Sequence, residues 1–179
     1  MSEISRRSQP SEDLRSAAQQ ITPRRGDRDL TKTMSTYLSL HYHLVFGTKE
    51  RRPFIKLLWR DCLHEYLGGT VRGLGGIPES VGGVDDHVHL LCGLRATHCL
   101  SDFMRELKKA SSVWASENHE RDFAWQEGYA AFTVSATSRE GVKRYIATQE
   151  EHHHKIGYRE ELEEMLKLAG VEYQHDYLP

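Results

Sequence analysis

Apolar and polar side chains alternate along residues 36–46, and this period of two is typical of a β-strand with one buried face. One face would carry Leu38, Leu40, Tyr42, Leu44 and Phe46, and the opposite face Ser39, His41, His43 and Val45. The run Arg51-Arg52-Pro53 follows, and proline cannot continue a hydrogen-bonded strand. We therefore expect the ordered part of the chain to open with a strand.

The remaining elements are predicted from the same kind of pattern. Apolar residues at helical spacing indicate helices, and short apolar runs bounded by glycine or acidic residues indicate strands. In chain order these are a helix over 54–72, strands over 77–84 and 88–94, a helix over 102–117, a strand over 129–135, and helices over 138–153 and 160–168. Ser101 is the expected N-cap of helix 102–117, and Thr137 with Glu140 forms an expected capping box for helix 138–153.

The predicted order is β-α-β-β-α-β-α, with the two central strands joined as a hairpin at Asp85-Asp86. The first six elements match the split βαβ, or ferredoxin-like, plan. This plan gives an α+β fold in which a four-stranded antiparallel sheet has two helices on one face. The third predicted helix is then an appended C-terminal helix.

The chain divides by composition into three parts. Residues 1–34 are rich in charge and interrupted by Pro10, Pro23 and Gly26, which predicts a disordered arm. A start codon chosen too far upstream would explain the same segment, and a basic arm that touches nucleic acid is a third interpretation. Residues 35–157 carry the predicted domain, and residues 158–179 form a C-terminal helical tail.

The composition is that of an ordinary globular domain. The chain has 179 residues, of which 38% are hydrophobic and 28% charged, and it is too short for an α/β barrel of roughly 250 residues. No apolar run approaches the roughly 18 residues of a membrane span and no signal segment opens the chain, so we expect a cytoplasmic protein without a membrane partner. The net charge of -2 counts against coating of duplex DNA, although it permits a local basic groove. Cys62, Cys92 and Cys99 lack the spacing of a zinc or disulfide framework.

His87 and His89 are separated by one residue on a predicted strand. Because side chains i and i+2 point to the same face, both imidazoles would project together while Val88 enters the other face. A divalent metal is the usual reason for two adjacent imidazoles, and the alternative is a pair of partly exposed strand histidines. A histidine-triad hydrolase would need a third histidine at Leu91, and an amidohydrolase would need a large barrel, so neither fits.

Tyr145 and Gln149 lie four residues apart on the predicted helix 138–153 and would share a helical face. A tyrosine hydroxyl is a weak nucleophile at its ordinary pKa of about 10 unless nearby positive charge lowers that pKa. Lys143, Arg144 or a bound metal could supply the charge. The alternative is an amphipathic helix whose Tyr145 packs against the sheet.

Five sequence blocks in this order resemble the single-tyrosine HUH transposases of the insertion-sequence 200/605 family. HUH denotes two histidines that flank a bulky apolar residue, here His87-Val88-His89. The blocks are LHYHLVFGTKERRPF, GGVDDHVHLL, FMRELKKASS, FAWQEGYAAFTVS and VKRYIATQEEHH, and the resemblance runs from about Ser35 to His154. The N-terminal arm, the glycine-rich stretch 68–76 and the segment 158–179 depart from the pattern. They leave open a resemblance to the repeat-associated tyrosine transposase branch.

The resemblance implies a transposase that cleaves and rejoins single-stranded DNA at ends that contain hairpins. His87, His89 and Gln149 would bind Mg2+ or Mn2+, and Tyr145 would attack the scissile phosphate to leave a 5′-phosphotyrosine and a free 3′-OH. A homodimer is also implied, in which Tyr145 acts in cis or in trans. One alternative is an HUH nuclease of replication initiation or relaxase type. The other is an inactive or domesticated protein that binds or processes single-stranded DNA hairpins and palindromic repeats.

Basic residues in two segments, together with one on the helix of Tyr145, are the expected contacts to DNA phosphates. They are Lys49, Arg51, Arg52, Arg105, Lys108, Lys109 and Arg144. A solvated surface is the alternative explanation for such charges.

Overall fold

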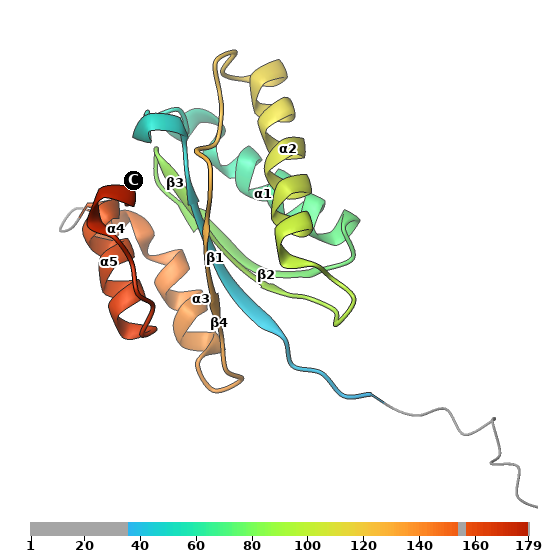
Figure 1. The fold of residues 1–179 in the computed structure, drawn as a ribbon. Helices are drawn as coiled ribbons and strands as arrows, with labels where there is room; N and C mark the ends of the chain where they lie inside the picture. The colour runs from blue at the N-terminus through green and yellow to red at the C-terminus, as the bar shows by residue number, and fades with distance from the viewer. Residues whose placement is uncertain (1–35, 154–156, 179) are drawn as a thin grey trace, which may run out of the picture. The chain divides into compact units, whose positions relative to one another are not determined.

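One of the two inner strands of the sheet is β1, His41–Gly47, and it is paired along both of its edges. In the computed structural model, which describes residues 36–153 and 157–178, β1 lies between β3, His87–Gly93, and β4, Ala130–Thr133. β2, Ile77–Gly83, pairs with the other edge of β3, which gives the antiparallel order β2-β3-β1-β4 (Figure 1). This is the order of a ferredoxin-like sheet, and the predicted α+β fold is confirmed.

The alternating pattern at the start of the chain extends further than the strand itself. β1 begins at His41, opposite the last residue of β3, Gly93, because a strand needs a partner edge for its hydrogen bonds. All the described helices and strands belong to one unit, Tyr37–Pro179. The arm predicted over residues 1–34 lies outside the described residues, as does His154.

Five α-helices and two short 3-10 helices accompany the sheet in the described part of the chain. α1, Leu57–Gly73, and α2, Leu100–Asn118, are the two helices of the ferredoxin-like plan. After β4 come α3, Arg139–Ala147, α4, Gln149–His153, and α5, Tyr158–Leu168, and the 3-10 segments are Lys49–Arg51 and His175–Tyr177. None of the helices described here has the length and apolar character needed to cross a lipid bilayer.

The two faces of the sheet have different partners. The main hydrophobic core lies on one face, where residues such as Leu44 of β1 and Leu90 of β3 pack with residues of α1 and α2. On the other face, Val45 packs against α5 and Leu91 packs against α3. Figure 1 shows α1 and α2 on one side of the sheet and α3 to α5 on the other. The histidines of β1 and β3 alternate with the main core residues and therefore point to this second side.

α3 approaches β2 so closely that the strand needs a glycine there. A Cβ atom at Gly82 would lie 2.4 Å from the carbonyl oxygen of Ile146, so any larger residue would push the helix off the strand. Near the start of α3, Arg139 Nε donates to Glu79 Oε2 of β2 at 3.0 Å, and Lys143 Nζ lies 3.3 Å from the same oxygen. These contacts fix the helix that carries the predicted nucleophile.

The predicted single helix over 138–153 is wrong, because the helix is interrupted at Thr148. This residue has φ -105° and ψ 20°, and its N–H bonds to the carbonyl oxygens of Arg144 and Tyr145. Its hydroxyl donates to the Arg144 carbonyl at 3.1 Å, a local bond of the kind that competes with helix continuation. α4 therefore starts anew at Gln149.

Both predicted helix caps are also wrong. The N-cap of α2 is Cys99, which places Ser101 inside the helix. The N-cap of α3 is Ser138 rather than Thr137, and it makes no side-chain cap hydrogen bond. Glu140 pairs with Lys143 Nζ at 2.9 Å.

Candidate active site

His87 and His89 are completely buried on the side of β3 that faces α3 and α5, with ring centroids 5.1 Å apart. The two side chains share a face, as predicted, and the alternative of a partly exposed pair is wrong. The sheet register adds His43 of β1, whose Nε2 lies 3.0 Å from His89 Nδ1. Burial and the neighbouring His89 lower the pKa of His43 to about 3, so His43 is neutral at physiological pH.

Asp86 fixes the orientation of the His87 ring. Its Oδ1 lies 2.7 Å from His87 Nδ1, and its Oδ2 accepts a 3.0 Å hydrogen bond from Arg51 Nε. A carboxylate that holds one ring nitrogen directs the other, here Nε2, toward a ligand, as at many metal-binding histidines. Burial disfavours the imidazolium form, but the carboxylates of Asp86 and Glu161 outweigh burial and raise the pKa of His87.

α5 adds a buried carboxylate to this cluster. Glu161 Oε2 lies 3.5 Å from Nε2 of His87 and 3.5 Å from Nε2 of His89. Glu161 Oε1 accepts hydrogen bonds from the Tyr145 hydroxyl and from Gln149 Nε2, the latter at 3.0 Å. The structure therefore gathers all four residues predicted for metal binding and catalysis around one carboxylate.

Sequence reasoning missed Glu161. The residue lies on the buried stripe of α5 together with Tyr158, Leu162 and Leu166. An acidic residue on an otherwise apolar helical stripe is unusual, because a buried carboxylate needs compensating partners. That position on the stripe is the signal by which Glu161 could have been found.

Tyr145 lies beside the histidines of its own chain. Its ring centroid is 5.8 Å from that of His89 and 6.1 Å from that of His43. Burial, reinforced by the hydrogen bond to Glu161, raises the pKa of Tyr145 above its ordinary value. The side chain is therefore a protonated phenol at neutral pH.

The basic neighbours do not lower the pKa of Tyr145, contrary to the interpretation made from the sequence. Lys143 is occupied by Glu79 and Glu140, with N–O distances of 3.3 and 2.9 Å. Arg144 is exposed and projects from the same helix. The dominant influences on the tyrosine are instead its burial and the carboxylate that accepts its hydrogen bond.

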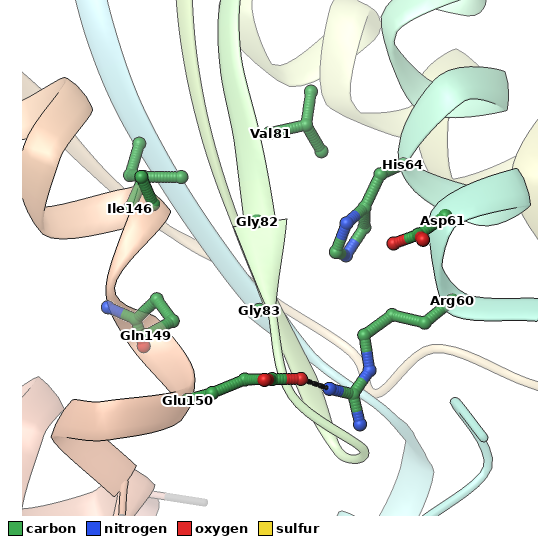
Figure 2. Close-up of a pocket in the computed structure, with 10 residues that line it drawn as sticks. Arg60, Asp61, His64, Val81, Gly82, Gly83, Ile146, Gln149 and Glu150 are labelled. Atoms are coloured by element: carbon green, nitrogen blue, oxygen red, sulfur yellow. Dashed lines mark hydrogen bonds and ion pairs between the residues drawn. The ribbon is translucent and has the colours of Figure 1, made fainter. Parts of the chain in front are cut away.

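Gln149 starts α4 and lines a pocket of about 250 Å³ between α1, β2 and α4 (Figure 2). Its side chain is almost fully buried, and its Oε1 has no hydrogen-bond partner among the described residues. Across the pocket, Glu150 of α4 pairs with Arg60 of α1, as Figure 2 shows. This ion pair ties the start of α4 to α1 and helps to fix Gln149.

The first group of predicted DNA contacts lies at one end of the active site. Lys49, Arg51 and Arg52 directly follow β1, whose last residue pairs with His87. Lys49 and Arg52 are exposed. Arg51 donates a hydrogen bond to Asp86, so it supports the carboxylate that orients His87 and also adds a positive charge near the site.

The second group lies on α2, which packs on the opposite face of the sheet from the histidines. Lys109 is exposed, whereas Arg105 pairs with two acidic residues of its own helix, and Lys108 donates to two backbone carbonyls of the segment before β4. Arg144, on α3, directly precedes Tyr145. The seven basic residues are thus not gathered on one face.

Comparison with known proteins finds similar chains among transposases. A family model for IS200-like transposases matches residues 36–149. The ISDra2 transposase TnpA of Deinococcus radiodurans is 28% identical over 130 residues, which cover 68% of this chain and 91% of that protein.

Two solved structures are also similar. A crystal structure of a chain described as a transposase, from Deinococcus radiodurans R1, has a TM-score of 0.53 and 27% identity, and covers 66% of this chain and 97% of that chain. A REP-associated tyrosine transposase bound to a REP hairpin has a TM-score of 0.52 and covers 69% of this chain and 76% of that chain. At 15% identity, the second similarity concerns the fold alone.

The ferredoxin-like fold and the match to the family model together define the class of the protein, a small DNA transposase. Because the family model matches more than half of its length, the chain belongs to the IS200-like transposase family. Its general function is DNA transposition, and its activity is that of a DNA strand transferase.

Proposed function

We propose that this transposase cleaves and rejoins single-stranded DNA at hairpin-containing ends through a 5′-phosphotyrosine on Tyr145, assisted by Mg2+ or Mn2+. The observation that carries the proposal is the convergence of His87, His89, Gln149 and Tyr145, from three separate elements, in one buried cluster. This set combines a nucleophile with a cation site. The REP hairpin bound by one structural neighbour supports a hairpin substrate for this chain as well.

The side chains of the cluster fit a divalent metal. One imidazole nitrogen of His87, one of His89 and a Glu161 carboxylate oxygen lie within 4.8 Å of one another, a spacing suited to one shared ion. Gln149 adds a buried amide oxygen for which no described residue supplies a hydrogen bond. His87, His89 and Gln149 would hold the ion, which when bound supplies Lewis-acid polarisation of the scissile phosphate.

Tyr145 performs the covalent step. Its hydroxyl oxygen attacks phosphorus, the bond between phosphorus and the 3′ oxygen breaks, and the products are a 5′-phosphotyrosine and a 3′-hydroxyl. Because the pKa of Tyr145 is raised, the phenol must lose its proton during the attack. Glu161 Oε1, which accepts the hydrogen bond from this hydroxyl, takes that proton, while the leaving 3′ oxygen gains one from solvent.

Strand joining is the reverse of this step. A second 3′-hydroxyl attacks the phosphotyrosine, a new phosphodiester forms, and Tyr145 regains its proton. The energy of the broken phosphodiester bond is retained in the phosphotyrosine bond, so no nucleoside triphosphate is required.

Exposed basic residues around the site are proposed to bind the DNA backbone. Lys49 and Arg52 lie at the His87 end of the sheet, and Arg144 lies next to the nucleophile. The cations of α2, Arg105, Lys108 and Lys109, would contact a more distant part of the substrate, because α2 packs on the other face of the sheet. The protein is further proposed to act as a homodimer, as the family resemblance implies.

The test uses single-stranded oligonucleotides copied from both flanks of the encoding gene, each with its hairpin. These are incubated with protein and Mn2+ and separated on denaturing gels. We expect a covalent protein–DNA adduct, and a chelator added before the DNA should prevent its formation. Tyr145→Phe should form no adduct, because phenylalanine keeps the ring and removes only the hydroxyl.

Hairpin binding by Tyr145→Phe should match the wild type in a gel-shift assay. The matched control is Tyr66→Phe on α1, where the ring stacks on Trp114 and the adduct should form as in the wild type. An adduct in Tyr145→Phe would exclude the proposed nucleophile. Hairpin binding by the wild type without any adduct would favour the inactive binding protein.

A further inference from the structure

We propose that Glu161 is itself a ligand of the metal, so that two histidines, the glutamine amide and a carboxylate from α5 would hold the ion together. This inference rests on the proposed function, because it concerns the same metal. It gives a role to a helix that lies beyond residues 36–149, the part of the chain that the family model matches.

The geometry supports a shared ion. Glu161 Oε2 is equally distant from the two imidazoles, 3.5 Å from Nε2 of His87 and 3.5 Å from Nε2 of His89. Asp86 on the far side of the His87 ring directs Nε2 toward this carboxylate. Two imidazole nitrogens and one carboxylate oxygen that face a common point form an established donor set for divalent first-row metals.

The chemistry of the ion favours the same assignment. Two imidazoles and an amide are neutral donors, whereas Mg2+ and Mn2+ prefer oxygen ligands and carboxylates in particular. Glu161 supplies both an oxygen and a negative charge. Because its side chain is only 2% exposed, its ionised form needs compensating partners. The hydrogen bonds from Tyr145 and Gln149 supply part of that compensation, and a cation beside Oε2 would supply more.

The packing of α5 holds the carboxylate in place. The ring of Tyr158 stacks on that of His87, with centroids 4.4 Å apart and planes inclined by 27°. The Arg51 guanidinium carbon lies 4.5 Å from the centre of the Tyr158 ring, and Leu162 packs against Val45 of the sheet. Glu161, one turn after Tyr158, is therefore carried by a helix that is docked on the sheet beside the histidines.

One carboxylate would then connect the nucleophile to the metal. Oε1 holds the Tyr145 hydroxyl while Oε2 faces the two imidazoles. Glu161 would fix the distance between the attacking oxygen and the ion that polarises the phosphate, which is the kind of positioning on which catalysis depends.

Mn2+ binding by the full-length protein without DNA tests this inference. Free Mn2+ is measured by electron paramagnetic resonance during a titration. Glu161→Gln keeps the size of the side chain and removes its charge, and we expect Mn2+ affinity to fall at least about tenfold. The matched control is Glu160→Gln on the exposed side of α5. The Glu160 side chain accepts a hydrogen bond from the Gly157 N–H, and glutamine keeps an acceptor for it. The Mn2+ affinity of this variant should equal that of the wild type.

Two further variants make the outcome decisive. Glu161→Asp keeps the carboxylate, so affinity above that of Glu161→Gln supports a ligand, and equal affinity of the two opposes it. His87→Ala should abolish Mn2+ binding. Thermal melts followed by circular dichroism establish that each variant is folded.

Unchanged Mn2+ affinity in Glu161→Gln would overturn the inference. Faster cleavage of hairpin DNA by the same variant would also overturn it, because the carboxylate would then obstruct the site. If His87→Ala binds Mn2+ as the wild type does, the proposed metal site itself is wrong. The failure of the inference is thereby separated from the failure of the proposed function.

Discussion

The ring of His87 lies between two carboxylates, with Asp86 on Nδ1 and Glu161 near Nε2. A carboxylate on Nδ1 selects the tautomer in which Nε2 can bind a metal, and it also fixes the plane of the ring. Asp86 is held in turn by Arg51. We therefore propose that Asp86 is a positioning residue, which would act on a bound metal through the imidazole.

We expect Asp86→Asn to weaken Mn2+ binding roughly 10–100-fold, as losses of such supporting partners typically do. An amide can present either a donor or an acceptor to Nδ1, so the tautomer would no longer be fixed. A Mn2+ titration measures the effect, with Asp85→Asn, the exposed neighbour in the same hairpin, as the control. Equal affinity of Asp86→Asn and the wild type would show that the orientation of His87 does not depend on this carboxylate.

At the level of single residues, prediction from sequence succeeded where the cause is local. The common face of His87 and His89 follows from the period of two within one strand. The apolar stripe of α5 singles out Glu161 as an unusual residue, but its partners could not be predicted, because they depend on where α5 docks on a sheet formed by much earlier residues. Tyr145 and Gln149 were identified through family resemblance and spacing. The carboxylate oxygen of Glu161 that accepts hydrogen bonds from both is brought to them by the tertiary structure.

Among the helices, α3 has the most evident anchor. Glu79 of β2 accepts from Arg139 Nε at 3.0 Å and lies 3.3 Å from Lys143 Nζ, and its side chain is largely buried. Burial alone would raise the pKa of Glu79, but the hydrogen bonds and charges of the two cations outweigh it and lower the pKa below 4.5. The carboxylate is thus ionised in the folded protein and stabilises it through α3.

We expect Glu79→Gln to lower the free energy of unfolding by roughly 1–3 kcal/mol at pH 7, because it weakens hydrogen bonds between charged groups. Since the folded-state pKa is lowered, this contribution is fully present above the unfolded-state pKa near 4.5 and is lost as the pH falls through the folded-state pKa. Urea unfolding measures the free energy of unfolding of Glu79→Gln and of the wild type at pH 7 and pH 3. The difference between the two proteins should be smaller at pH 3 than at pH 7.

The control for this measurement is Glu140→Gln. Glu140 pairs with the same lysine but is exposed, and exposed pairs contribute little to stability. If the free energies of unfolding of Glu79→Gln and the wild type differ by the same amount at both pH values, the ionised carboxylate of Glu79 does not stabilise the packing of α3.

Element order and strand pairing were predictable, because hydrophobic periodicity indicates strands and helices and because the β-α-β-β-α-β order permits few antiparallel topologies. The break at Thr148 was not. Threonine is tolerated within helices, and no proline or glycine lies between Val142 and His153 to mark a break. The residues that follow the break make contacts outside the helix: Gln149 donates a hydrogen bond to Glu161 on α5, and Glu150 forms an ion pair with Arg60 on α1.

In the whole unit from Tyr37 onward, the site is assembled within one chain. Tyr145 lies 5.8 Å, ring to ring, from His89 of the same chain, and the two are linked through Glu161. The sequence left open whether the tyrosine acts in cis or in trans. From this geometry we predict that Tyr145 acts in cis within the proposed homodimer.

A mixing experiment separates the two cases. Tyr145→Phe retains the histidines and His87→Ala retains the tyrosine, so each variant alone should form no adduct. If Tyr145 acts in cis, an equimolar mixture of the two also forms none, because neither chain holds a complete site. If the tyrosine acts in trans, mixed dimers would contain one complete site and the adduct would reappear on denaturing gels.

Mass spectrometry can locate the DNA on the protein. Trypsin cleaves after Arg144 and Lys155, so Tyr145 is the single tyrosine of the peptide 145–155, whereas Tyr158, which stacks on His87, falls in the peptide 156–159. Adduct formed with Mn2+ and a hairpin oligonucleotide should carry its nucleotide mass on the peptide 145–155, and a chelator added before the DNA should prevent this modification. Nucleotide on the peptide 156–159, or strand cleavage with neither peptide modified, would contradict the assignment of Tyr145 as the nucleophile.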